Sequence, residues 1–496
     1  MGREVMIVLL FVVCVASLLF FAVFLFQISR PRRTPRKEPA VRKVSTSEAV
    51  EPAAGRKWLI HLEQQMAEFL LQNKTTAILL VVLAISSASL VAQEQGGPPP
   101  NSDEQQPRQM AQQSSDPISA PAMQPADQQQ TAGQSSPPAP SPLPTPAITG
   151  PLQAAPPITF EGGPFGKLNL DGVVSGIGLW QGNHVPGDNT TQAALSNGQV
   201  FIQKTTSWWQ FYVQAGAYDI LALGTPFLST QKVISDLYGP VPVAYVKLVP
   251  TKTFSVMIGA LPTLMGAEYT FDFENMNIER GLLWNQENAI NRGIQVNQTL
   301  GKFTASLSWS DGYYSNRYSW LSGSLTYVNG PHSLSFIGMG NLGQTAFQTL
   351  ATPVQNNSLM YAAIYTYTKG SWIVQPYFQY SNVPTNPSVG VLHGASTWGG
   401  AVLASHTFKH GFSLAGRGEY ITSTGSLAEQ SVNLLYGPGS GGWSITLTPT
   451  YQYQRFFTRA DFSWVQATSF APGNAFGSTG TNANQPRGVI EVGFLF

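Results

Sequence analysis

The sequence is poor in charged residues. Only 11% of its 496 residues are Asp, Glu, Lys or Arg, whereas ordinary soluble domains carry about 25%. A surface that faces water on every side is therefore excluded. The 27 basic and 26 acidic residues nearly cancel, which excludes nucleic acid as a partner because nucleic-acid binding needs a basic surface.

Cysteine is nearly absent as well. The one cysteine, Cys14, lies in the first apolar run, so the rest of the chain can form neither a disulfide framework nor a cysteine metal site. The sequence also lacks His-Glu-x-x-His, Gly-x-x-x-x-Gly-Lys and Gly-x-Ser-x-Gly. These spacings support metalloprotease, phosphate-binding and serine-hydrolase chemistry. We therefore expect no enzyme, no cofactor and no metal site.

Two apolar runs of different kinds lie near the N-terminus. The run Met6–Phe26 is uncharged and long enough for a helix across a bilayer, which needs about 20 residues. A second run, Ala77–Ala92, is shorter, follows Lys74 and ends among small residues, the pattern of a secretory signal. Since Met66 begins this second pattern, we assign residues 66–92 to a signal peptide.

Residues 1–65 leave two interpretations open. They are either a mistaken extension of the reading frame or a transmembrane helix over 6–26 followed by a basic cytoplasmic loop. The cleavage point of the signal is open too. Cutting after Ala88 or Ser89 leaves smaller residues before the cut than cutting after Ala92 does.

Residues 93–157 have a different composition. Pro, Gln, Ser, Ala and Gly dominate, with almost no aromatic or β-branched residue. Such a segment cannot bury enough apolar surface to offset the entropy lost on ordering. We expect a disordered periplasmic linker, and the alternative is a cell-wall anchor or a partner-binding tail.

From residue 158 to 496, short runs alternate between apolar and polar side chains and are separated by turn residues. In the clearest run, one set comprises Trp443, Ile445, Leu447, Pro449, Tyr451 and Tyr453, and the other Ser444, Thr446, Thr448, Thr450 and Gln452. Runs 302–310 and 372–380 repeat the scheme. A period of two places each set on one side of a sheet. The polar sets are mainly Ser, Thr, Gln, Asn and Gly.

The apolar face of such a sheet is either the core of a soluble sandwich or the lipid side of a membrane barrel. Aromatic residues at the strand ends favour the barrel, because aromatic girdles flank its apolar band. Lipid does not tolerate open sheet edges. The sequence therefore predicts an all-β fold, a closed antiparallel transmembrane β-barrel of about 16 strands, within about 14–18.

The predicted strand centres lie near residues 174, 202, 213, 245, 258, 296, 308, 324, 336, 364, 376, 403, 418, 449, 462 and 492. A further pairing by Ser431–Tyr436 would change the count.

Two features of this region carry a family resemblance. A strand ends in a Gly- and Pro-containing turn, followed by a glutamate, a long loop and a glycine-led strand. The positions concerned are Gly259, Pro262, Gly266, Glu268 and Gly293. An Arg-x-acid-aromatic step occurs at Arg417–Tyr420 and again at Arg459–Phe462. In these features residues 160–496 resemble the OmpL-like β-barrel porins. The resemblance implies an outer-membrane pore of modest selectivity, without catalytic residues.

The segment Gly488–Phe496 forms another alternating run. The residues on one of its faces are Ile490, Val492, Phe494 and Phe496. This run resembles the terminal strand by which the outer-membrane insertion machinery recognises its clients. It differs in one respect, because Glu491 stands where a glycine is common.

Carboxylates gather in one predicted loop. They are Glu268, Asp272, Glu274, Glu279 and Glu287, with Arg280 and Arg292 nearby. One interpretation is a solvated extracellular loop, with a calcium ion near Asp272 and Glu274 as a variant. The other folds the loop into the pore as a constriction, because rings of charged side chains set the selectivity of pores.

Two pairs on later strands bear on this choice. Arg417 and Arg459 lie at inward-facing positions, where they face the acidic loop across the opening or pair along the wall with Glu419 and Asp461. Opposed charges would create a transverse field that favours small polar solutes. The candidate constriction residues are Glu268, Asp272, Glu274, Glu279, Arg280, Glu287, Arg417, Glu419, Arg459 and Asp461.

Taken together, these features predict passive diffusion of small hydrophilic solutes or ions across a bacterial outer membrane. The expected partners are the lipid bilayer, the insertion machinery and the solutes, and a homo-oligomer is allowed. The alternative is a structural or adhesive barrel tethered by its Pro-rich tail. A hydrolase is disfavoured because no nucleophile–base pair can be named.

Overall fold

The structure is a computed structural model that describes residues 150–343 and 354–496. Residues 1–65, the signal peptide assigned to 66–92 and nearly all of the 93–157 linker lie outside the described residues, so these assignments stay predictions. In the part described, no helix has the length and apolar character needed to cross a membrane.

Strands dominate the described chain. They are β1 Ile158–Glu161, β2 Lys167–Gln181, β3 Thr191–Lys204, β4 Trp209–Tyr218, β5 Val243–Thr251, β6 Phe254–Pro262, β7 Ile290–Leu300, β8 Phe303–Ser310, β9 Trp320–Asn329, β10 His332–Asn341, β11 Leu359–Lys369, β12 Trp372–Val383, β13 Ala395–Thr407, β14 Phe412–Ser423, β15 Gly441–Tyr453, β16 Phe456–Thr468 and β17 Asn484–Leu495. The short helical elements are η1 Gly163–Phe165, α4 Thr230–Val233, η2 Ile234–Tyr238, η3 Asp272–Glu274, η4 Trp284–Gln286, η5 Val354–Asn357 and η6 Pro387–Val389.

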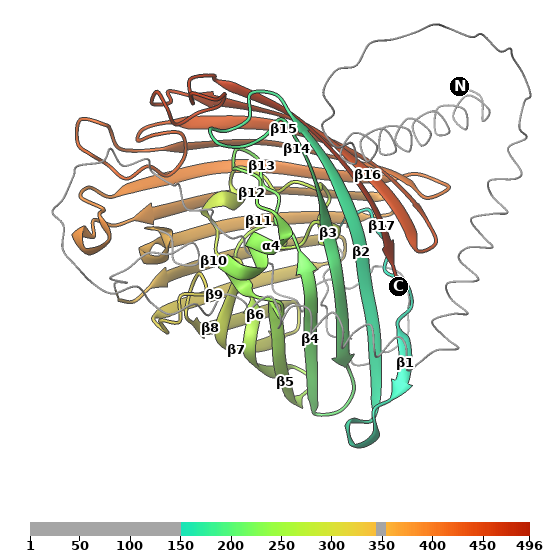
Figure 1. The fold of residues 1–496 in the computed structure, drawn as a ribbon. Helices are drawn as coiled ribbons and strands as arrows, with labels where there is room; N and C mark the ends of the chain where they lie inside the picture. Colours follow the sequence, from blue (N-terminus) through green and yellow to red (C-terminus); the bar gives the residue numbers. More distant parts are fainter. Residues whose placement is uncertain (1–149, 344–353) are drawn as a thin grey trace, which may run out of the picture. The chain divides into compact units, whose positions relative to one another are not determined.

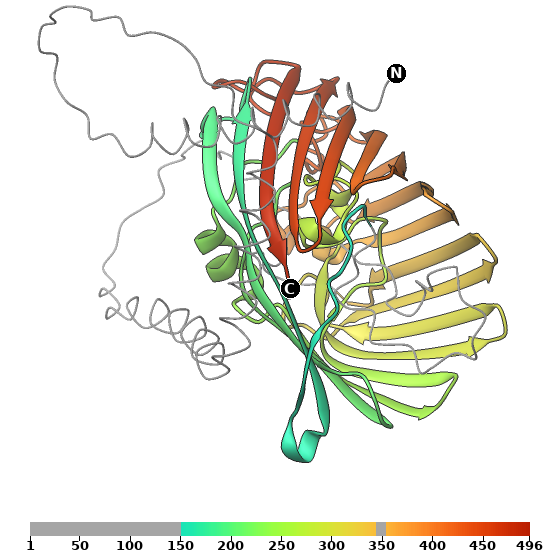
Figure 2. The same ribbon diagram turned by 90° about the vertical axis from the view of Figure 1, so that its right-hand side faces the viewer.

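The strands β2–β17 close into a ring. Each strand pairs antiparallel with the next, and β17 returns to β2, where Phe494 lies opposite Val174. The short β1 pairs with the first residues of β2, on the edge that β17 uses further along. Figures 1 and 2 show the strands curving into this wall. The predicted sixteen-strand barrel is confirmed, and every predicted centre falls within a strand. Ser431 makes only an isolated bridge, to His393.

Burial alternates along the strands in the sense expected of a membrane barrel. On β8, Leu307 and Trp309 are each 51% exposed, whereas Ser306 and Ser308 are buried. On β15 the threonines are buried, and Ile445 is exposed. A soluble protein would bury these apolar side chains, so the outer face is one that contacts lipid acyl chains.

The two ends of the barrel differ in their connections. At one end, the two-residue turns Gly301–Lys302, Gly330–Pro331 and Gly370–Ser371 each begin with a glycine at a φ of 59° or 60°. This hairpin type needs a positive φ at its first position, which glycine adopts without strain. Long loops, including 219–242 and 263–289, join the strands at the other end. Short turns face the periplasm in such barrels.

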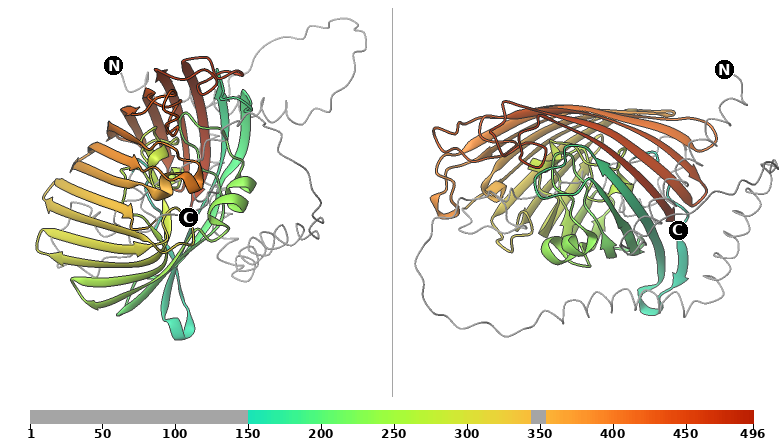
Figure 3. Two further views of the ribbon diagram at one scale, coloured as in Figure 1. Left: turned by 90° about the vertical axis from the view of Figure 1, so that its left-hand side faces the viewer. Right: turned by 45° about the horizontal axis from the view of Figure 1, so that its top comes forward.

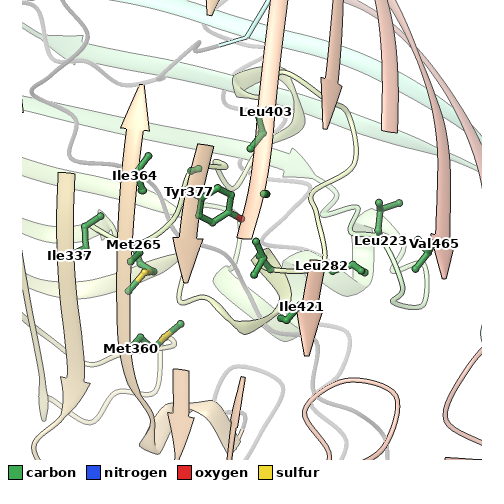
Figure 4. Packing of buried hydrophobic residues seen from close by; sticks show 14 of the residues in the cluster. Leu223, Met265, Leu282, Ile337, Met360, Ile364, Tyr377, Leu403, Ile421 and Val465 are labelled. Atoms are coloured by element: carbon green, nitrogen blue, oxygen red, sulfur yellow. The ribbon is translucent and has the colours of Figure 1, made fainter. Parts of the chain in front are cut away.

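The inward-facing side chains are not uniformly polar. On β10, β11 and β13 they include Ile337, Met360 and Leu403, which belong to one apolar cluster with Met265 and Leu282 of the 263–289 loop (Figure 4). The prediction of a mainly polar inner face is therefore correct for β8 and β15, and on β12 the inward positions include Gln375, Gln379 and Ser381. It is wrong for the apolar inner positions of β10, β11 and β13. Alternation separates the two faces of a strand, but it does not tell which inner residues a loop will contact.

Candidate functional site

The loop 263–289 enters the barrel interior. It connects β6 to β7, and its yellow-green trace lies within the ring of strands in Figures 2 and 3. The exposed fractions of Glu268 and Asp272 are 1%, and those of Glu274, Glu279 and Glu287 are 0%. A solvated extracellular loop is therefore wrong. The loop with most of the acidic candidates is an interior element.

The local sequence of the loop explains its compact path. The side chain of Asn275 accepts a hydrogen bond from the backbone of Tyr269 at 2.6 Å and donates to the carbonyls of Tyr269 and Phe271, each at 2.8 Å. Gly281 lies against the Glu419 carboxylate with no room for a β-carbon. Gly266 has a φ of 89°, and a β-carbon there would collide with the carboxylate of Glu287. Asn275 therefore closes the turn, and the two glycines allow the backbone of the loop to approach the carboxylates of Glu419 and Glu287.

Arg417 of β14 joins the loop to the wall. Its Nη1 lies 2.5 Å from Glu268 Oε1 and donates to the carbonyl of Glu279 at 2.6 Å. Its Nε is 3.5 Å from the carboxylate of Glu419 on the same strand. Glu419 in turn accepts the backbone N–H groups of Leu282 and Leu283, at 2.8 and 3.2 Å. Arg417 therefore both contacts the acidic loop and pairs along the wall with Glu419, so the two alternatives for this residue occur together.

Arg459 and Asp461 of β16 hold a second stretch of the loop. Arg459 donates to the carbonyls of Asp272 and Asn275, at 3.0 and 2.9 Å, and its ion pair is with Glu491 of β17 at 3.5 Å. Asp461 accepts the backbone N–H of Glu279 at 2.8 Å. Of the two alternatives for Arg459, pairing with Asp461 along one strand is wrong, because the ion pair is with cross-strand Glu491.

The remaining acidic candidates lie deeper in the loop. Asp272 accepts hydrogen bonds from the side chains of Ser196 and Asn197 on β3. Glu274 and Glu287 are fully buried within the barrel. In the residues described, no group of three or more His, Cys, Asp and Glu side chains is arranged to hold a metal ion. The oxygens that the calcium variant would use at Asp272 are occupied by β3.

Arg280 does not reach the wall. Its guanidinium donates to the carbonyls of Ile278 and Thr270 and lies 5.3 Å from the ring centroid of Trp284. Burial lowers the pKa of Arg280, and the nearby Asp272 and Asp219 oppose that shift. Arg280 therefore organises the loop from within.

Sequence reasoning missed Arg487. Its Nε lies 3.0 Å from Glu279 Oε1, and its Nη1 donates to the carbonyl of Ala222 at 2.8 Å. The signal was available, since Arg487 shares its parity with Glu491 on an alternating strand. Asp219 was missed too and accepts a hydrogen bond from Ser196. It follows β4 in a loop, and no local sequence pattern predicts that this loop turns into the barrel.

The buried acids of the loops titrate abnormally. Burial raises the pKa of Glu268, and Arg417 opposes the shift. Burial also raises the pKa of Glu279, against the effect of Arg487. The pKa of Asp219 is raised well above its ordinary value by burial and by nearby Asp272. The arginines therefore offset only part of the cost of burying these carboxylates.

The terminal strand has the predicted geometry. Ile490, Val492 and Phe494 share the outward-facing parity of β17, and the rings of Phe494 and Phe496 stack with centroids 6.3 Å apart. Phe496 also exchanges two backbone hydrogen bonds with Gly172. Recognition of this strand by the insertion machinery stays a prediction.

These observations define a class of protein: a closed β-barrel with an apolar outer face, polar side chains on its inner face and a long loop folded inside. Residues 167–496 match the family described as "Putative beta-barrel porin-2, OmpL-like". The chain belongs to this family. It is a β-barrel porin of the bacterial outer membrane, and its function is that of a passive channel.

Solved porins are similar to the chain at low sequence identity. The channel DcaP of Acinetobacter baumannii is 10% identical, with a TM-score of 0.46 over 66% of this chain and 97% of that one. The anion-selective porin from Comamonas acidovorans is 11% identical, with a TM-score of 0.44 over 66% and 99%. OmpF of Salmonella typhi, in complex with daunomycin, is 11% identical, with a TM-score of 0.46 over 68% and 100%. No curated protein sequence matches the chain.

Proposed function

We propose that small hydrophilic solutes diffuse through this barrel and that the 263–289 loop forms its constriction. The observation that carries the proposal is the anchoring of an interior loop to the wall by buried charges, above all Glu268 to Arg417 at 2.5 Å. A loop held in this way narrows the interior permanently. No energy source is required, because the solutes move down their own gradients.

Planar-bilayer recording of the full chain tests the proposal. Residues 264–288 are replaced by a short Gly-Ser linker, which the pairing of Pro262 with Ile290 allows because the ends of β6 and β7 are adjacent. We expect ohmic conductance from the natural protein and a larger conductance, with a larger size limit for neutral polymers, from the shortened variant. The matched control shortens loop 469–483 and should leave the conductance near its natural value.

Two results would contradict the proposal. Equal conductance in the natural and shortened proteins, with both barrels folded, would exclude the loop as the constriction. A folded but silent natural barrel would favour the structural or adhesive alternative. Folding is checked by the shift in gel mobility between unheated and heated samples.

The partners follow from the same surfaces. The exposed apolar side chains of β8 and β15 fit acyl chains, and the β17 face that ends at Phe496 fits recognition by the insertion machinery. A homo-oligomer is a further proposal, which the mass of the detergent-solubilised protein would test.

A further inference from the structure

Charge is distributed unevenly around the inner wall. On the strands described, buried charged side chains occur on β3, β5, β14, β16 and β17. The eight adjacent strands β6–β13, half of the ring, contain none. Their two charged residues, Arg292 and Lys369, stand near strand ends on the parity of the outward-facing side chains. We call β6–β13 the uncharged half.

The other half of the ring, β14–β17 and β2–β5, is the charged half, and its charged side chains on β14, β16 and β17 contact the inner loops. Arg417, Arg459 and Arg487 each donate to an atom of the loop or to the neighbouring 219–242 segment. Asp461 and Glu419 accept backbone N–H groups of the loop. A charge that is paired and covered in this way is poorly placed to bind a passing ion.

The uncharged half has two chemical parts. On β8 and β9 the inner face bears hydroxyl groups, since Ser306 lies opposite Ser324 and Ser308 opposite Ser322. On β10, β11 and β13 it bears apolar side chains such as Met339, Ile364 and Leu403, which lie in one buried cluster with side chains of the 263–289 loop. The loop therefore packs against the apolar part of the uncharged half.

The hydroxyl part is unsatisfied by the protein. The Oγ atoms of Ser306, Ser310, Ser322 and Ser324 are buried, and they have no hydrogen-bond partner among the described residues. A buried hydroxyl without a partner costs about 1–3 kcal/mol. Partners from outside the protein, either water or a solute, are therefore required along this wall.

From these observations we infer that the solute path follows the hydroxyl part of the uncharged half, on β8 and β9, and that its preferred solutes are uncharged molecules with several hydroxyl groups. The inference rests on the proposed function and names its substrate class. An ion on this path loses water without meeting an opposite charge. A neutral polyol exchanges its water for serine hydroxyls.

Uptake by proteoliposomes containing the full chain tests the inference. The probes are glucose, methyl β-glucoside, glucosamine and glucuronate, which have similar sizes and differ in charge. We expect the two neutral sugars to enter about threefold to tenfold faster than the charged ones.

A pair of matched variants locates the path. The double variant Ser306→Ala, Ser324→Ala removes two hydroxyls from the uncharged half and should slow glucose uptake about threefold. Thr450→Val removes a buried, unpartnered hydroxyl from β15 in the charged half and should leave uptake unchanged. Both changes are small enough for the barrel to fold.

The outcomes separate the two proposals. If glucosamine or glucuronate enters as fast as glucose, or if Thr450→Val slows uptake as much as the serine variant, the inference is overturned while the pore function stands. If no probe enters through a folded barrel, the proposed function fails, and the inference fails with it.

Discussion

The strands β14–β17 and the strands β6–β13 have the same outer face and different inner faces. Outside, both present exposed apolar side chains, such as Phe462 on β16 and Leu307 on β8. Inside, β14–β17 hold arginines and acids that contact the loop, whereas β6–β13 hold hydroxyl, amide and apolar side chains. Lipid imposes one requirement on every strand. The interior imposes none in common: β14, β16 and β17 hold the loop through charged side chains, whereas β10–β13 contact it through apolar and amide side chains.

The largest expected effect comes from breaking the anchor on the charged half. Arg417→Met leaves Glu268 and Glu419 buried without their cation, and breaking a buried pair costs about 3–5 kcal/mol. Gln379→Met on the uncharged half removes one hydrogen bond, to the carbonyl of Leu283, and should cost about 0.5–1.5 kcal/mol. Denaturant unfolding in detergent measures both losses.

A rescue sharpens that result. Adding Glu268→Gln to Arg417→Met removes one stranded charge and should recover part of the lost stability. Equal losses in the Arg417 and Gln379 variants would show that the two halves hold the loop equally, contrary to the comparison.

Forcing the loop off the charged wall should have the next largest effect. Gly281→Val places a side chain where the Glu419 carboxylate lies and should cost about 1–3 kcal/mol through overpacking. We expect the conductance to rise as the loop is displaced. Gly418→Val is the control, since Gly418 lies on β14 with open space around it. A conductance change of the same size in the control would remove the steric explanation.

The stability of the folded protein should depend on pH, because the pKa values of buried carboxyl groups in the inner loops are raised. The folded protein holds protons on Asp219, Glu268 and Glu279 at pH values where the unfolded chain has released them. Stability from these groups is therefore complete below the ordinary carboxyl pKa, about 4. It is lost as the pH rises through the raised values.

Unfolding midpoints between about pH 4 and pH 8 measure this slope. Asp219→Asn removes one of the titrating groups, so this variant should be more stable than the natural protein at the upper end and show a weaker slope. A midpoint for the natural protein that does not fall with rising pH would contradict the assignment.

The smallest effect on the finished barrel is expected at its last residue. Phe496→Ala keeps the backbone hydrogen bonds to Gly172 but removes the ring stacked on Phe494. We expect slower assembly in cells with nearly unchanged conductance once the barrel has formed. Pulse-labelling of the heat-resistant form measures assembly, and unaltered kinetics would exclude a role for the ring in recognition.

Much of the fold could be predicted because the relevant signal is local. Alternation in 443–453 and 302–310 reveals the two faces of a strand, and glycine-led turns such as Gly301–Lys302 mark the strand ends. The site was only partly accessible. Parity placed Arg417 and Arg459 inside, but it did not identify Glu491 as the partner of Arg459, because pairing across strands depends on register.

The alternating pattern was enough to predict the barrel, its strands and its lipid-facing side, because a period of two and the chemistry of the bilayer leave few alternatives. The tertiary structure alone decided where the 263–289 loop lies, which charges it covers, and which half of the wall remains uncharged. Those outcomes depend on contacts between residues far apart in the chain, such as Glu268 and Arg417. No local pattern encodes the partner of a buried charge.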